Sequence, residues 1–120
     1  MRYRTLTRNN DFSRAYARGK AFVHPYAVLY INKNRCRHTR VGLTASKKIG
    51  NAVARNRARR IMRAALAQVL PYNVGGYDVV AVARGITPKL KSTQLVPVFR
   101  RNLEKAGLLQ GKGPQPGPRE

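Results

Sequence analysis

The segment Asn51–Leu70, NAVARNRARRIMRAALAQVL, carries the strongest structural pattern in the chain. An α-helix advances by about 100° per residue, and at that angle most of the apolar side chains of this segment fall within one arc. The arc consists of Ala54, Ala58, Ile61, Met62, Ala65, Leu66 and Val69. Five arginines cover the rest of the surface, and no acidic residue accompanies them. The pattern predicts a long helix that packs through its apolar arc, exposes a cationic surface and ends before Pro71.

Segments rich in β-branched and aromatic residues predict four strands around this helix. Their ranges are 20–24, 26–32, 40–45 and 77–83. In the second range, alternation places Val28 and Tyr30 on the face opposite to Leu29. The last range, YDVVAVA, is apolar almost throughout. That composition predicts a central strand buried on both faces.

Two shorter helices are predicted near the ends of the domain. The Asn9-Asn10 pair can cap the first, and Gly19 can end it in a left-handed conformation. The second covers 92–106, but Pro97 fits poorly in a helix interior and favours a start later than Ser92. The order α-β-β-β-α-β-α predicts a single α+β domain, with helices packed against a four-stranded sheet.

The ends of the chain differ from the domain in composition. Residues 1–8 are interpreted as a basic extension. The domain is assigned to residues 1–106. Residues 107–120 form a Gly/Pro-rich tail that is predicted to be disordered.

Charge limits the classes of partner. Twenty-five Lys and Arg residues against four acidic residues give this chain of 120 residues a formal net charge of +21. No acidic residue lies between Phe12 and Tyr77. Such self-repulsion favours a polyanionic partner, and a phosphate backbone releases its counterions when cations bind it. A merely solvated surface normally mixes both signs, so nucleic acid is the predicted partner.

The chain carries none of the usual sequence signs of export. The single cysteine, Cys36, excludes an internal disulfide and fits a reducing compartment. The basic N-terminus is not followed by an apolar run, so no signal peptide is expected. No segment has the apolar length of a membrane span, and no helix has the large apolar face that favours binding to a membrane surface. We expect a cytoplasmic protein with no membrane partner.

Catalytic and metal-binding residues are not predicted in this chain. Metal-assisted hydrolysis of a phosphodiester requires clustered carboxylates, whereas the four acidic residues here are scattered. His24 and His38 have no carboxylate close in sequence to orient them. A nuclease that acts alone is therefore disfavoured.

The segment that precedes the long helix is a candidate phosphate site. Ser46, Lys47, Lys48 and Gly50 lie where the backbone N–H groups of a helix N-terminus are free to bind an anion. The alternative is an ordinary loop with Asn51 as the helix cap, and both interpretations can hold together.

Three aromatic residues are a further candidate site. Phe12 and Tyr16 lie four residues apart on one helix face, and Tyr30 lies on a strand. Such residues most often belong to a core. Beside Lys and Arg they can instead stack on the unstacked bases of single-stranded RNA.

The run RVGLTASKKIGNAVARNRARRIMR, residues 40–63, resembles the signature of the bacterial ribonuclease P protein subunit. The shared features are an Arg55-Asn56-Arg57 core in a basic helix and the preceding Ser-Lys-Lys and Gly-Asn-Ala-Val motifs. Weaker similarity covers 10–12, the strand ending at Tyr30, and 77–84. The resemblance implies a fold like that of ribosomal protein S5 domain 2. That fold has a left-handed βαβ crossover around the long helix, where the general rule predicts a right-handed one.

The resemblance also implies a function and two sets of binding residues. In this family a catalytic RNA, with Mg²⁺ held mainly by RNA, removes the 5′ leader of precursor tRNA. The expected partners are that RNA and precursor tRNA, with no obligate protein partner. Residues expected to contact the catalytic RNA are Arg55, Asn56, Arg57, Arg59, Arg60 and Arg63. Residues expected to contact the leader are Phe12, Tyr16, Tyr30, Ser46, Lys47, Lys48 and Arg84. Charge alone would fit a ribosomal RNA-binding protein equally well.

Overall fold

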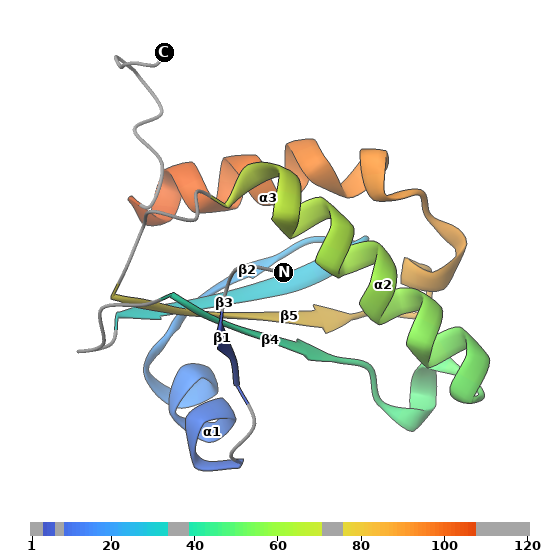
Figure 1. Ribbon diagram of the computed structural model, residues 1–120, viewed down its shortest axis with the longest axis horizontal. Helices are drawn as coiled ribbons and strands as arrows, with labels where there is room; N and C mark the ends of the chain where they lie inside the picture. Colours follow the sequence, from blue (N-terminus) through green and yellow to red (C-terminus); the bar gives the residue numbers. More distant parts are fainter. Residues whose placement is uncertain (1–3, 7–8, 34–38, 71–75, 108–120) are drawn as a thin grey trace.

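A mixed β-sheet separates two layers of helices in the computed structural model, which describes residues 4–6, 9–33, 39–70 and 76–107 (Figure 1). The strands are β1 (Arg4–Thr5), β2 (Lys20–Val23), β3 (Ala27–Lys33), β4 (Arg40–Thr44) and β5 (Tyr77–Ala83). The helices are α1 (Asn9–Arg18), α2 (Ala52–Val69) and α3 (Ser92–Ala106), with short 3₁₀ helices η1 (Lys47–Ile49) and η2 (Thr87–Lys89). Helices α2 and α3 cover one face of the sheet, and α1 lies against the other.

The strands follow the spatial order β1-β4-β5-β3-β2. Strand β4 pairs in parallel with both β1 and β5, whereas β3 is antiparallel to β5 and to β2. The α+β class and the order of the longer elements are as predicted, and β5 is the central strand. The left-handed sense of the β4–α2–β5 crossover stays a prediction from the resemblance.

One strand was not predicted. Residues 1–8 were interpreted only as a basic extension and the sheet was predicted to have four strands, yet Arg4–Thr5 pairs with the edge of β4 as a fifth strand, β1. The following Leu6 donates its N–H to the Val41 carbonyl at 3.0 Å and is buried. Two residues are too few to show an alternating pattern, so this pairing depends on the free edge of β4.

The main core lies between the sheet and the α2/α3 layer. Leu29 of β3, Met62 and Leu66 of α2, and Phe99 of α3 are all fully buried there. The predicted arc of α2 is confirmed, because its buried residues belong to that arc. The predicted alternation of β3 is also confirmed, because Leu29 faces this core while Tyr30 packs on the opposite side.

A smaller core lies between the sheet and α1. Leu6, Ala15 and Val80 are buried in it, and Phe12 is partly buried against them. Helix α1 approaches β4 closely, since a Cβ atom at Gly42 would lie 2.5 Å from Cε1 of Phe12. Gly42 is therefore the position that lets the Phe12 ring rest on the sheet.

Two predictions about helix ends were wrong. Gly19 ends α1, and its N–H donates to the Ala15 carbonyl at 2.8 Å. It does not take a left-handed conformation, because the chain passes directly into β2 at Lys20. Helix α3 begins at Ser92 and not later, although Pro97 lies inside it. Its first turn is held by Gln94, whose side chain accepts from the Lys91 N–H at 2.8 Å.

Several sequence-based predictions fall outside the described residues. They are those on Cys36, on His38, on Pro71 and on the tail beyond Gly107. Within the described part of the chain, none of the helices has both the length and the apolar character that crossing a membrane requires.

Candidate nucleic-acid interface

The N-terminus of α2 sets the orientation of its cationic side chains. The side-chain oxygen of Asn51 accepts the N–H of Ala54 at 2.9 Å, so Asn51 is the helix cap, as one of the two interpretations predicted. Burial of Ala58, Met62 and Leu66 then fixes the rotation of the helix about its axis. The arginines are therefore held on the outer side of α2.

We call the six predicted contacts on α2 the arginine surface: Arg55, Asn56, Arg57, Arg59, Arg60 and Arg63. Four of them are exposed, while Arg55 and Arg59 are partly buried at the border of the apolar arc. Arg59 donates from Nη1 to the side-chain oxygen of Asn56 at 3.0 Å. Because α2 has no acidic residue, its guanidinium groups remain available to phosphate oxygens, which they can bind in a bidentate manner.

The three aromatic residues come together on the other face of the sheet. The rings of Tyr16 and Tyr30 meet edge to face with centroids 4.9 Å apart. Tyr16 is 41% exposed, whereas Phe12 and Tyr30 are partly buried in the smaller core. Phe12 therefore belongs to the smaller core, whereas the ring of Tyr16 reaches solvent. Stacking of these rings on RNA bases stays a prediction.

A row of side chains beside this trio was missed by sequence reasoning. The strand register aligns Thr44 of β4 with Val82, Val82 with Val28, and Val28 with Val23. Paired residues share a face, so the row lies on the same side as Tyr30. It lies one step nearer the C-terminal ends of β4 and β5, which α1 does not cover in Figure 1. Val23 is 71% exposed. We call the aromatic trio and this row the α1-face surface.

Four predicted polar contacts lie at the edge of the α1-face surface. Ser46, Lys47 and Lys48 follow the end of β4, Arg84 follows the end of β5, and all four are exposed. Because β4 and β5 are parallel, their C-terminal ends meet at the same edge of the sheet. Ser46 makes no capping bond to η1, so its hydroxyl is not occupied there. Its role as a phosphate ligand stays a prediction.

Comparison with known proteins identifies the family. The family model described as Ribonuclease P matches residues 1–107. The chain belongs to the ribonuclease P protein family. This ribonuclease P protein is thus a component of the ribonucleoprotein that processes the 5′ ends of tRNA, and its partner is RNA.

Curated relatives and solved structures agree with this assignment. A ribonuclease P protein component from Clostridioides difficile (strain 630) is 40% identical over 84 residues, covering 69% of this chain and 74% of the relative. One from Clostridium botulinum (strain Langeland) is 35% identical over 109 residues, covering 90% and 98%. The structure of the Staphylococcus aureus RNase P protein superposes with a TM-score of 0.72 at 28% identity, covering 87% of this chain and 95% of that one. The Thermotoga maritima protein, at 23% identity and a TM-score of 0.70, supports the fold alone.

A buried ion pair of this ribonuclease P protein was also missed by sequence reasoning. Asp78 is 1% exposed, and both of its carboxylate oxygens accept from Arg40, from Nε and from Nη2, each at 2.9 Å. The signal that could have revealed it is an acidic residue in an otherwise apolar strand. The pair is directly opposite in the register of β4 and β5, so it ties together the two strands that flank the α2 crossover.

Proposed function

We propose that this ribonuclease P protein binds the catalytic RNA through the arginine surface and the 5′ leader of precursor tRNA on the α1-face surface. In the cytoplasm it would thereby assist the Mg²⁺-dependent removal of the leader. The observation that carries this proposal is the position of the two surfaces. One lies outside α2 and the other on the far side of the sheet, so two RNA segments can bind at the same time.

The arginine surface suits a folded RNA. Its cations line the outside of a helix that a packed core holds in one orientation. A row of arginines on one fixed helix suits phosphates that are themselves held at fixed spacing. It carries no aromatic ring, so its chemistry favours contacts to the RNA backbone.

The α1-face surface suits a single strand. Unpaired bases can stack on the exposed ring of Tyr16 and lie over the exposed side chain of Val23 at the end of the neighbouring sheet row. Lys47, Lys48 and Arg84 stand at the edge of this surface, where they would meet the phosphates of the same strand.

We further propose that the RNA subunit carries out the hydrolysis and holds the Mg²⁺ ions. The side chains that the structure describes do not fit a magnesium site, which needs several oxygen ligands. Among the residues that the structure describes, no group of three His, Cys, Asp or Glu side chains could hold a metal ion. Asp78 carries a buried carboxylate, and that carboxylate is engaged by Arg40.

Cleavage of precursor tRNA tests the proposal. A bacterial ribonuclease P RNA is incubated with precursor tRNA at low Mg²⁺, with and without the chain, and the release of the leader is measured. We expect clear stimulation by the chain and weaker stimulation by Arg60→Ala/Arg63→Ala. The matched control, Arg100→Ala/Arg101→Ala, removes the same charge from exposed positions of α3 and should stimulate like the unmodified chain. No stimulation over RNA alone would overturn the proposal.

A further inference from the structure

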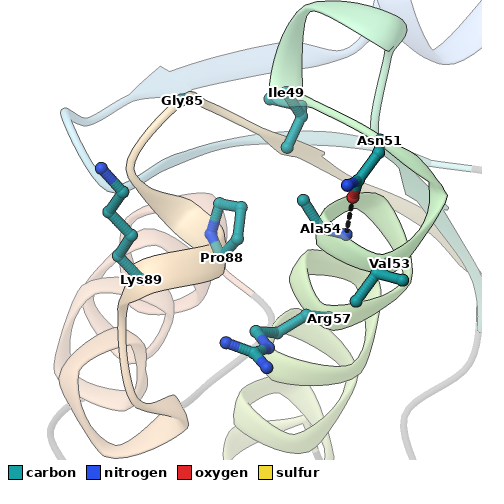
Figure 2. A pocket seen from close by; sticks show the side chains of 8 residues that line it. All are labelled: Ile49, Asn51, Val53, Ala54, Arg57, Gly85, Pro88 and Lys89. Carbon is teal, nitrogen blue, oxygen red and sulfur yellow. Dashed lines mark hydrogen bonds between the residues drawn. The ribbon is translucent and has the colours of Figure 1, made fainter.

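An open pocket of about 420 Å³ lies between the start of α2 and η2 (Figure 2). Pro88 of η2 faces Ala54 of α2 across it, and Ile49 reaches in from the end of η1. Val53 and Gly85 complete the largely apolar lining. A volume of this size is typical of sites that bind small organic groups, which are usually between about 300 and 1,000 Å³.

The walls of the pocket are held in place by hydrogen bonds. On one side, Asn51 caps α2. On the other, the buried hydroxyl of Thr87 donates to the Tyr26 carbonyl at 2.6 Å and accepts the Arg84 N–H at 2.8 Å. These bonds attach η2 to the start of β3, so the pocket is formed before any ligand arrives.

Two cations stand at the rim of the pocket. The guanidinium group of Arg57 extends from α2 toward η2, and Lys89 lies on the opposite wall with its ammonium group directed outward. No acidic residue lines the pocket or occupies the first turn of α2. The helix N-terminus adds further positive potential, because the first N–H groups of a helix have no partner within it.

Exposed apolar side chains mark this place as a second contact area. Val53 is 68% exposed and Ile86, which precedes η2, is 43% exposed. The other large exposed apolar residues among those described, Tyr16 and Val23, belong to the α1-face surface on the far side of the sheet. Apolar groups beside cations suit a ligand that combines a flat apolar body with negative charge.

We propose that this pocket binds one unstacked nucleobase of the catalytic RNA, and that Arg57 and Lys89 bind the phosphates on either side of it. The inference rests on the proposed function, in which α2 contacts that RNA. A phosphate alone would lose its hydration over an apolar floor, whereas a base gains by leaving water there. An apolar peptide would match the floor but not the cationic rim. The guanidinium of Arg57 can in addition stack on the base.

Two variants test the pocket without removing a cation. A Cβ atom at Gly85 would meet no atom within 4 Å, and no left-handed backbone is required there, so Gly85→Leu can fill the pocket from the η2 side. Val53→Ser removes an exposed apolar wall with little risk to folding. Val23→Ser is the matched control, because Val23 is similarly exposed but lies on the α1 face. Thermal unfolding of each variant verifies the fold.

The affinity for a bacterial ribonuclease P RNA, without substrate, is measured over a series of salt concentrations. We expect Gly85→Leu and Val53→Ser to weaken binding roughly tenfold, the loss of one stacked base, with the salt slope unchanged. Val23→Ser should bind like the unmodified chain. Unchanged affinity for both pocket variants would overturn the inference. If Arg60→Ala/Arg63→Ala still lowered affinity in that case, the proposed function would stand, and if it did not, the proposed function would fail as well.

Chemical probing of base reactivity in the same complex identifies the occupant. At least one unpaired base of the catalytic RNA should be protected by the unmodified chain and become reactive again with Gly85→Leu. Protection that persists with Gly85→Leu would contradict the inference. The probing is repeated after precursor tRNA is added to the complex, and a pocket-dependent base that lies in this substrate would also contradict the inference. Competition by an apolar peptide without any change in base reactivity would contradict it as well.

Discussion

The two faces of the sheet differ in how completely helices cover them, and therefore in the size of the core that each face buries. On the α2/α3 face, two helices cover a large core, and four of the six residues of the arginine surface are exposed to solvent. On the α1 face, one short helix covers part of the strands, and the sheet itself contributes the binding surface. The core between the sheet and the α2/α3 layer fixes the orientation of α2, so the outer side of this helix can carry dense positive charge. On the α1 face, the single short helix leaves Tyr16 and Val23 exposed, so these side chains are accessible to bases.

The largest difference between the faces should appear in stability. Phe99→Ala opens a cavity in the sealed core and should lower the free energy of unfolding by about 3–5 kcal/mol. Phe12→Ala should cost clearly less, because the Phe12 ring is only partly buried. Urea denaturation of both variants measures the two losses. Equal losses in the free energy of unfolding would mean that the α1 face buries its side chains as completely as the α2/α3 face does.

The close approach of α1 to β4 should make the stability of the fold sensitive to a substitution at Gly42. Gly42→Ala places a methyl group against the Phe12 ring and should destabilise the fold by about 1–3 kcal/mol. Gly85→Ala is the matched control, since its methyl group would meet open space, and its effect should stay within about 0.5 kcal/mol. Thermal denaturation compares the pair, and a neutral Gly42→Ala would show that α1 does not need this contact.

Stacking on the α1 face should show in substrate binding. Tyr16→Ala should weaken binding of precursor tRNA to the holoenzyme by about 1–3 kcal/mol, if one leader base stacks on the exposed ring. Mature tRNA, which has no leader, should bind as before. Equilibrium binding of both tRNAs provides the measurement. Equal loss for the two substrates would assign Tyr16 to the core alone.

The smallest effect should be electrostatic and confined to α2. Arg60→Ala should reduce the slope of log K against log salt for the catalytic RNA by roughly one unit, the share of one phosphate contact. Arg100→Ala, an exposed arginine on α3, should leave the slope unchanged. Filter binding at several salt concentrations distinguishes them. Equal changes in slope would indicate a diffuse charge effect and not a defined arginine surface.

Much of the fold followed from patterns within single segments. The extent of α2, its apolar arc, the bounds of β5 and the alternation of β3 were all predicted, because helix and strand periodicities are written in consecutive residues. The start of α3 was wrong because Pro97 was given too much weight against the hydrogen bonds of the first turn. The resemblance supplied the two sets of candidate contacts. The structure places the arginine surface on α2 and the aromatic trio on the other face of the sheet, with Ser46, Lys47, Lys48 and Arg84 at the edge where β4 and β5 end.

Consecutive residues were thus sufficient for the longer elements, for the cationic side of α2 and for a nucleic-acid partner, since periodicity and charge are local properties. Other features exist only where distant segments meet. They are the pairing of β1, the Arg40–Asp78 ion pair, the row that ends at Val23, and the pocket between α2 and η2. Each depends on strand register or on the distance between elements, which the packing of the whole chain sets. Tertiary structure therefore turned a generally cationic chain into one with two separate surfaces and a pocket.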